Sequence, residues 1–131
     1  MKKLLLTMAV VALLVPALAS AQTTRLSPQM QRVMDDITRL QAILTDASAN
    51  VDFSDATWRT VANEANALAN RIVGRTSSWR SESRDAAKNL RMHVREMRAA
   101  ALKGDEAGAK KHAAEALPFA TTLAARIRGT T

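Results

Sequence analysis

Apolar residues recur along this chain at alternating steps of three and four, in four separate stretches. An α-helix completes a turn in about 3.6 residues, so this spacing places the apolar side chains on one face of each helix. The expected helices cover about residues 28–49, 52–74, 79–103 and 104–128. Short connections between helices of similar length predict an all-α fold, an antiparallel up-down-up-down four-helix bundle.

The apolar rows predict which side chains are buried between the helices. Their members are Met30, Val33, Ile37, Leu40, Leu44 and Ala47; Trp58, Val61, Ala65, Leu68 and Ile72; Ala87, Leu90, Val94, Met97 and Ala101; and Ala113, Leu117, Ala120, Ala124 and Ile127. The leucines that we expect to be buried are Leu40, Leu68, Leu90 and Leu117. Glu64, inside the second helix, has no partner that the sequence identifies.

Residues typical of helix ends separate the four stretches. Ser27 before Pro28 is an N-cap followed by proline at the first helical position. Asp52, with Asp55 three residues later, is expected to cap the second helix. Gly104 marks the turn into the fourth helix.

Residues 1–21 have the pattern of a signal peptide. Lys2-Lys3 is followed by an apolar run over 4–15, shorter than the about 20 residues that span a bilayer. Ala19-Ser20-Ala21 matches a small-x-small cleavage site. We therefore expect cleavage before Gln22, export to a bacterial periplasm, and one bundle domain over residues 22–131 that no disulfide stabilises, because the chain contains no cysteine.

The fourth stretch reads GDEAGAKKHAAEALPFATTLAARIR. Its Gly-Asp start, alanine-rich helix and closing Ile127-Arg128 pair resemble the last helix of the cytochrome c-prime family and its b-type four-helix relatives. In that family, a haem-binding Cys-x-x-Cys-His lies two residues before an aromatic and a basic residue. The cysteines would fall at Ala120 and Leu123 and the histidine at Ala124, so the defining motif is missing. The resemblance implies the fold but no covalently attached haem.

Met30 is the candidate ligand that the resemblance suggests for non-covalent haem b. In the b-type relatives an early methionine of the first helix is an axial ligand, followed by apolar residues at steps of three, four and three. Met30, Val33, Ile37 and Leu40 reproduce that spacing. The alternative is that Met30 fills the core, as methionine commonly does. We expect the small Ala120 and Ala124 to let the helices pack closely and close a haem pocket.

His93 is a second candidate ligand, for haem or for copper. His93 and Met97 are four residues apart and share a helix face, and imidazole with thioether is a ligand set that copper(I) accepts. The alternative places His93 at the edge of the core with Met97 inside it. His112 follows two lysines and is expected to be a solvated surface residue.

Positive charge is concentrated on the third helix. Residues 22–79 carry six basic and six acidic residues, so the excess lies in residues 80–131. The basic strip, as we call it, consists of Arg80, Arg84, Lys88, Arg91, Arg95 and Arg98. It is either a surface for an anionic partner or membrane, or a solvated face whose long stems cover apolar surface. Nucleic acid is not the expected partner, because the chain is exported and has few aromatic residues to stack on bases.

The chain carries no recognisable catalytic motif: no Gly-rich phosphate loop, no His-Glu-x-x-His and no Glu-x-x-His of the ferritin type. We therefore expect a non-catalytic periplasmic binding or scaffold protein, a monomer or homodimer, with no cofactor. Two alternatives stay open. One is an electron carrier that binds haem b through Met30 and His93, and the other is a Met/His copper-binding protein.

Overall fold

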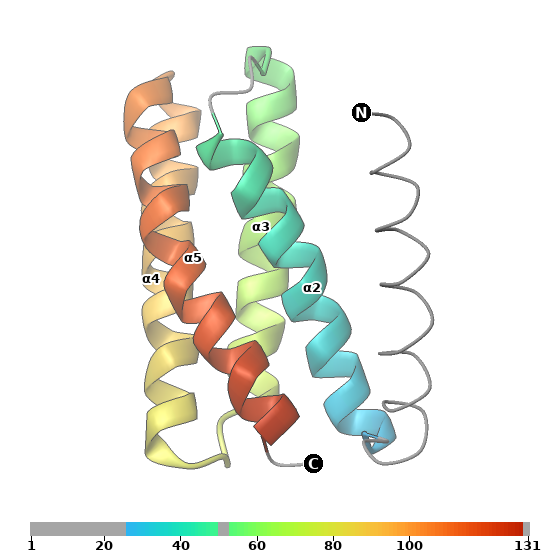
Figure 1. Ribbon diagram of the computed structural model, residues 1–131. Helices are drawn as coiled ribbons and strands as arrows, with labels where there is room; N and C mark the ends of the chain where they lie inside the picture. The colour runs from blue at the N-terminus through green and yellow to red at the C-terminus, as the bar shows by residue number, and fades with distance from the viewer. Residues whose placement is uncertain (1–25, 50–52, 130–131) are drawn as a thin grey trace, which may run out of the picture.

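The computed structural model describes residues 26–49 and 53–129, and all regular secondary structure within these ranges is helical. The helices are α2 (Pro28–Ser48), α3 (Asp55–Arg75), α4 (Ser81–Leu102) and α5 (Glu106–Gly129) (Figure 1). Helix α2 packs on α3, α3 on α4, α4 on α5, and α5 back on α2. The predicted all-α four-helix bundle is confirmed at this level. The predicted signal peptide, residues 1–21, lies outside the described residues.

Serine side chains start the first two helices. The backbone N–H of Met30 donates to Ser27 Oγ at 3.2 Å, and Pro28 occupies the first turn as predicted. At α3 the N-cap is Ser54, whose Oγ accepts from the Thr57 N–H at 3.2 Å. The prediction of an aspartate cap was wrong here, because Asp55 is already helical; Asp52 lies outside the described residues. Ser54, which directly precedes the helix, accepts a hydrogen bond from one of the free N–H groups of its first turn.

Gly104 closes α4 with a left-handed turn. Its φ is 81°, and the N–H groups of Gly104 and Asp105 donate to the carbonyls of Ala101 and Ala100 at 3.1 and 2.9 Å. This pair of bonds is the Schellman arrangement, which favours glycine because it has no Cβ. Asp105 then caps α5: its Oδ1 accepts from the Gly108 N–H at 2.9 Å.

The core follows the predicted rows most closely in α4, where all five predicted positions are buried. Leu40, Leu68 and Leu90 are also buried, with 0%, 4% and 0% of their surface exposed. Leu117 was predicted wrongly: it is half-buried at the core edge, and Ala116 is buried instead. Helix α5 packs against both α4 and α2, and its buried face consists of five alanines and two larger side chains near its end. Its members are Ala109, Ala113, Ala116, Ala120, Leu123, Ala124 and Ile127.

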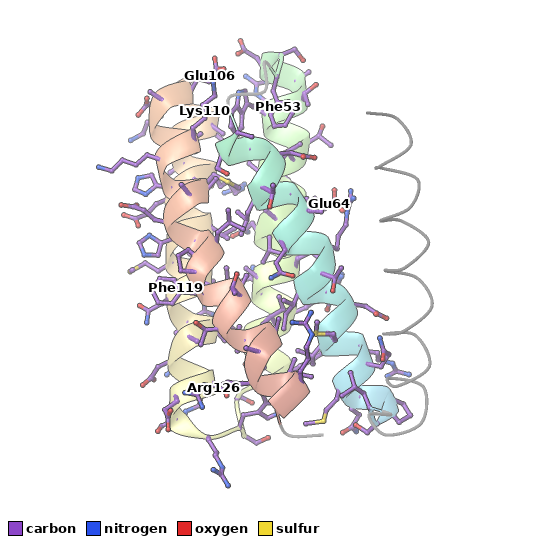
Figure 2. All side chains as sticks on the ribbon, viewed as in Figure 1. Phe53, Glu64, Glu106, Lys110, Phe119 and Arg126 are labelled. Carbon is purple, nitrogen blue, oxygen red and sulfur yellow. The ribbon has the colours of Figure 1, made fainter. Side chains whose placement is uncertain are left out.

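Three ion pairs, formed by two acidic and three basic residues, connect α2 to α3 along their solvent edge in the described part of the chain. Arg39 donates two hydrogen bonds to Glu64, at 2.7 and 3.0 Å, so Glu64 does have a partner (Figure 2). Asp36 accepts from Arg71 at 2.9 Å and lies 3.8 Å from Arg75. The hydrogen bonds from Arg39 hold the pKa of Glu64 below its ordinary value of 4.5, while partial burial opposes the shift.

Helix α5 continues through Pro118 without interruption. Pro118 removes one backbone N–H, so the carbonyl of Ala114 loses its helical partner. Both residues are exposed, so water can satisfy that carbonyl.

No helix in the described part of the chain is long and apolar enough to cross a membrane.

Replacing Leu90 by alanine should lower the free energy of unfolding by about 2–5 kcal/mol, because a fully buried leucine leaves a cavity. Urea unfolding followed by circular dichroism measures this change. Leu117→Ala is the matched control and should cost distinctly less, since Leu117 is half-buried. Equal losses in the two variants would show that the core does not lie where the structure places it.

Glu64→Gln should destabilise the protein at neutral pH and have no effect in acid. The folded-state pKa of Glu64 is lowered, so its contribution is present above 4.5 and is lost as pH falls through the folded pKa. Urea unfolding at pH 7 and pH 3 measures the difference. In an Arg39→Gln background the same substitution should have little effect at either pH, and an undiminished effect there would assign the stabilisation to another partner.

Candidate functional site

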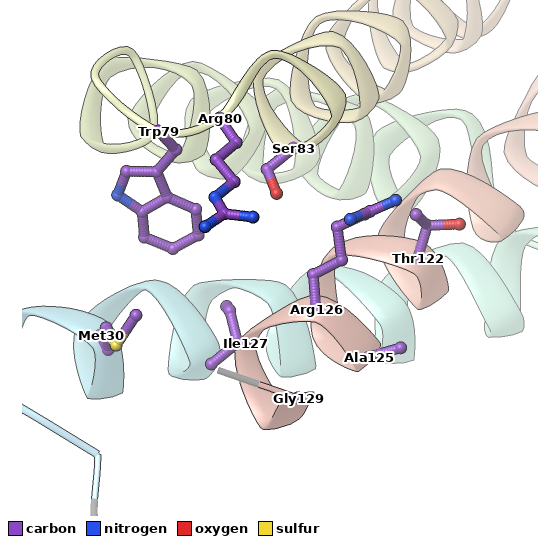
Figure 3. A pocket seen from close by; sticks show the side chains of 9 residues that line it. All are labelled: Met30, Trp79, Arg80, Ser83, Thr122, Ala125, Arg126, Ile127 and Gly129. Atoms are coloured by element: carbon purple, nitrogen blue, oxygen red, sulfur yellow. The ribbon is translucent and has the colours of Figure 1, made fainter. Parts of the chain in front are cut away.

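A pocket of roughly 950 Å³ opens at the end of the bundle where α2 and α4 begin and α5 ends (Figures 1 and 3). It is lined by Met30, Trp79, Arg80, Ser83, Thr122, Ala125, Arg126, Ile127 and Gly129. The thioether, the indole and Ile127 give it an apolar surface, and two guanidinium groups and two hydroxyls are its polar groups. Concave sites that are mainly apolar with a few polar groups are the usual form of small-molecule sites.

Met30 lies where a ligand could contact it. Its backbone N–H is held by the N-cap serine, and its half-buried side chain also lines a neighbouring pocket of roughly 340 Å³ together with Trp79. The structure therefore places Met30 at the pocket rather than in the core. No residue of the described lining is a histidine. His93, the other predicted haem ligand, is not among the lining residues, so the two candidate ligands are not brought together at this pocket.

Two small residues of α5 that neighbour the pocket lining in sequence belong to the core. Ala120 and Ala124 have 0% and 1% of their surface exposed, so the helices are closely packed at the positions where the family's motif would fall. The α5 residues that line the pocket include Thr122, which lies between the two alanines in the sequence, and Ala125 and Arg126, which follow them. Both alanines are buried, and the concave site is lined by other residues of α5.

The charge at the pocket mouth is uneven. Arg126 of α5 donates to Glu82 of α4, so its charge is paired (Figure 2 labels Arg126). Arg80, which lies just before α4, has no acidic partner within salt-bridge distance among the described residues. Its guanidinium projects toward the pocket together with the Trp79 indole (Figure 3). Within the described residues, the Arg80 charge thus lies uncompensated beside an apolar surface, which suits an anionic group on an apolar ligand.

Four ionisable side chains meet between α4 and α5, away from that pocket. His112 Nδ1 lies 3.0 Å from Glu115 Oε1 and 3.8 Å from Glu96 Oε1. His93 Nδ1 lies 3.5 Å from Glu96 Oε1 and 3.6 Å from Glu115 Oε1. We call these four residues the His-Glu cluster. Each helix contributes one histidine and one glutamate three residues later, which places both on the same side of that helix.

The imidazole rings of the cluster are held by stacking. The His93 ring lies parallel to Phe119 of α5, with centroids 5.5 Å apart and planes 14° apart (Figure 2 labels Phe119). It also stacks on His112 at 6.5 Å. The prediction that His112 is a solvated surface residue was wrong, because its side chain is only 25% exposed. His-x-x-Glu occurs twice in the sequence, at 93–96 and 112–115, and this repetition could have indicated the cluster.

Met97 does not share the environment of His93. Met97 is fully buried in the core, whereas His93 is half-buried and faces α5. Met92, the other nearby thioether, is 47% exposed. The partners that the structure gives His93 are therefore carboxylates and an imidazole.

The basic strip does not form a uniform surface. Arg80 lines the pocket, and Arg98 donates to Asn63 of α3 at 2.8 Å. Arg84 donates to the Trp79 carbonyl at 3.4 Å and is half-buried. Within the described ranges, no acidic group lies within salt-bridge distance of Arg84, Lys88, Arg91 or Arg95.

The chain matches no protein-family model, no curated protein and no solved structure. The cytochrome c-prime resemblance thus stays a prediction, based on the residues of the fourth stretch and on Met30. Two features of the structure are candidate binding sites: the pocket at the bundle end and the His-Glu cluster.

Proposed function

We propose that this chain is a non-catalytic binding protein whose ligand occupies the pocket at the end of the bundle. The observation that carries the proposal is the pocket itself: an apolar surface of Met30, Trp79 and Ile127 beside the guanidinium of Arg80, which has no acidic partner among the residues that the structure describes. Such a lining suits a small molecule with an apolar ring system and one anionic group. Export to the periplasm as a monomer or homodimer, expected from residues 1–21 and from size, is part of the proposal.

The antiparallel, up-down-up-down order of the helices also belongs to this proposal. Support comes from cross-helix pairs in which a later residue on one helix meets an earlier residue on the next. Asp36 pairs with Arg71, while Arg39, further along α2, pairs with the earlier Glu64. The same order brings the end of α5 to the start of α4, where the pocket opens.

Haem b, the first alternative, has one supporting observation, the placement of Met30 at the pocket. The residues contributed by α5, among them Thr122 and Ala125, offer no imidazole or thioether opposite it. The described lining therefore fits an apolar anion better than haem iron, which its protein ligands hold by axial bonds. The copper alternative would need the Met97 thioether, which is buried in the core.

The pocket should bind anilinonaphthalene sulfonate, an apolar ring system with one sulfonate, at one equivalent. Filling the pocket from its α5 side with Ala125→Trp should weaken binding about tenfold, roughly the loss of 1.4 kcal/mol of binding free energy. Dye fluorescence at fixed protein concentration measures the affinity. Ala114→Trp, an equally exposed alanine of α5 outside the pocket lining, is the matched control and should bind like wild type.

Loss of dye binding in both tryptophan variants, or in neither, would contradict the assignment of the pocket. A parallel titration with haemin distinguishes an apolar anionic ligand from haem b, the first alternative. The account predicts no sharp Soret band at one equivalent. A sharp band that disappears in Met30→Ala would replace the anionic ligand by haem and make the protein an electron-carrier candidate.

The basic strip supports a second binding role, docking to an anionic partner or membrane surface. Lys88 and Arg95 are exposed, and the four central residues of the strip lack acidic partners in the described part of the chain. Arg84 and Arg91 are half-buried, and their spacing places their charges along the same side of α4 as those of Lys88 and Arg95. An ion-pair-free row of cations attracts anionic surfaces more strongly than a neutralised row.

Reversing Arg84, Arg91 and Arg95 to glutamate should abolish retention on phosphatidylglycerol vesicles at moderate salt. Vesicle sedimentation measures the bound fraction, and circular dichroism checks the fold. The control variant reverses Arg59, Lys103 and Lys111, which are exposed and lie outside the strip, with the same change in net charge. Equal losses in both variants would show that net charge, and not the strip, attracts the vesicles.

A further inference from the structure

The His-Glu cluster has the ligand atoms of a metal site, and its four His–Glu pairs have a spacing close to that of such a site. In a tetrahedral zinc site with bonds of about 2.0–2.1 Å, neighbouring ligand atoms lie about 3.3 Å apart. The His–Glu distances measured from the two Nδ1 atoms are 3.0, 3.5, 3.6 and 3.8 Å. One ligand atom each from His93, Glu96 and His112 lies within 4.8 Å of the other two. Glu115 is the fourth candidate ligand, because its Oε1 lies 3.0 Å from His112 Nδ1 and 3.6 Å from His93 Nδ1.

A second, independent observation concerns His93 alone. Its Nδ1 is buried and has no hydrogen-bond partner, although it faces two carboxylates. A buried polar atom without a partner costs about 1–3 kcal/mol, so it calls for an explanation. A metal ion bound by this nitrogen would supply the partner.

The surroundings favour an ion that enters from solvent. The Glu96 and Glu115 side chains are 49% and 41% exposed, while the imidazoles are 18% and 25% exposed. The carboxylates thus form the outer half of the site and the rings the inner half. Phe119 stacks on His93 and holds its ring plane, which reduces the ordering required on binding.

We propose that His93, Glu96, His112 and Glu115 bind one divalent transition-metal ion of the zinc type between α4 and α5. Two imidazole nitrogens and two carboxylate oxygens suit Zn²⁺, and the same donors accept Co²⁺ or Cu²⁺. No thioether belongs to this set, so it differs from the Met/His copper(I) site considered from the sequence. The site lies apart from the pocket at the bundle end and needs no ligand there.

Zinc should bind the purified protein at one equivalent and raise its thermal midpoint, because the ion binds the folded chain. Isothermal titration calorimetry measures affinity, and differential scanning fluorimetry measures the midpoint. His93→Ala and His112→Ala should each weaken binding at least about tenfold, as loss of a ligand removes a coordinate bond. Cobalt in place of zinc should give the intense visible bands of a tetrahedral ion.

Glutamate variants provide a test that does not depend on whether the histidine variants fold. Glu96→Gln with Glu115→Gln changes only exposed groups, so the variant should fold normally and still lose most zinc affinity. Glu106→Gln, another exposed glutamate of α5 that lies outside the cluster, should bind zinc like wild type. Zinc binding that survives both histidine variants, or no binding at millimolar zinc, would overturn the proposal. In that case the four residues would form a cluster of ion pairs only.

Discussion

The close contact between α4 and α5 is the constraint on which the other features of this structure depend. These two helices have the most extensive packing in the bundle. Five buried alanines of α5 face the other helices, and alanine permits helix axes to approach more closely than leucine does. With no disulfide and few aromatic side chains, the chain depends on this packing for its stability.

The positions of both candidate sites depend on the α4–α5 packing, which is close along the middle of the two helices and ends near the end of α5. Along the middle of α4 and α5 the helices are close enough for two histidines and two glutamates to meet across the interface. Beyond the buried Ala124 the lining changes to Ala125, Arg126 and Ile127, and the helices leave a pocket beside Met30. One bundle thus provides a polar cluster on its side and a concave apolar surface at its end.

The sequence predicted the helices well because a strict step of three and four is a strong signal over about 20 residues. It predicted the buried face of α5 less well. In an alanine-rich helix, adjacent rows differ little in hydrophobicity, so Leu117 was chosen over Ala116 although packing between two helices favours the smaller residue. The Ser54 cap was missed because two aspartates nearby have the same propensity.

The apolar pattern of a single helix does not predict which polar side chains of neighbouring helices contact one another. The pairing of Glu64 with Arg39 and the meeting of His93 with His112 depend on how neighbouring helices are aligned. The repeated His-x-x-Glu was visible in the sequence, but a repeat on two helices becomes a site only when those helices face each other. The sequence of each helix alone therefore predicted a solvated His112 and a thioether partner, Met97, for His93.

A crystal structure of the purified protein grown with zinc, with diffraction data at the zinc absorption edge, tests the α4–α5 contact most directly. The account predicts one strong anomalous peak within about 2.0–2.2 Å of a nitrogen from each histidine and an oxygen from each glutamate of the cluster. It also predicts that the α5 alanines stay buried. A peak elsewhere, or histidine rings that point away from each other across a wider helix spacing, would contradict the account.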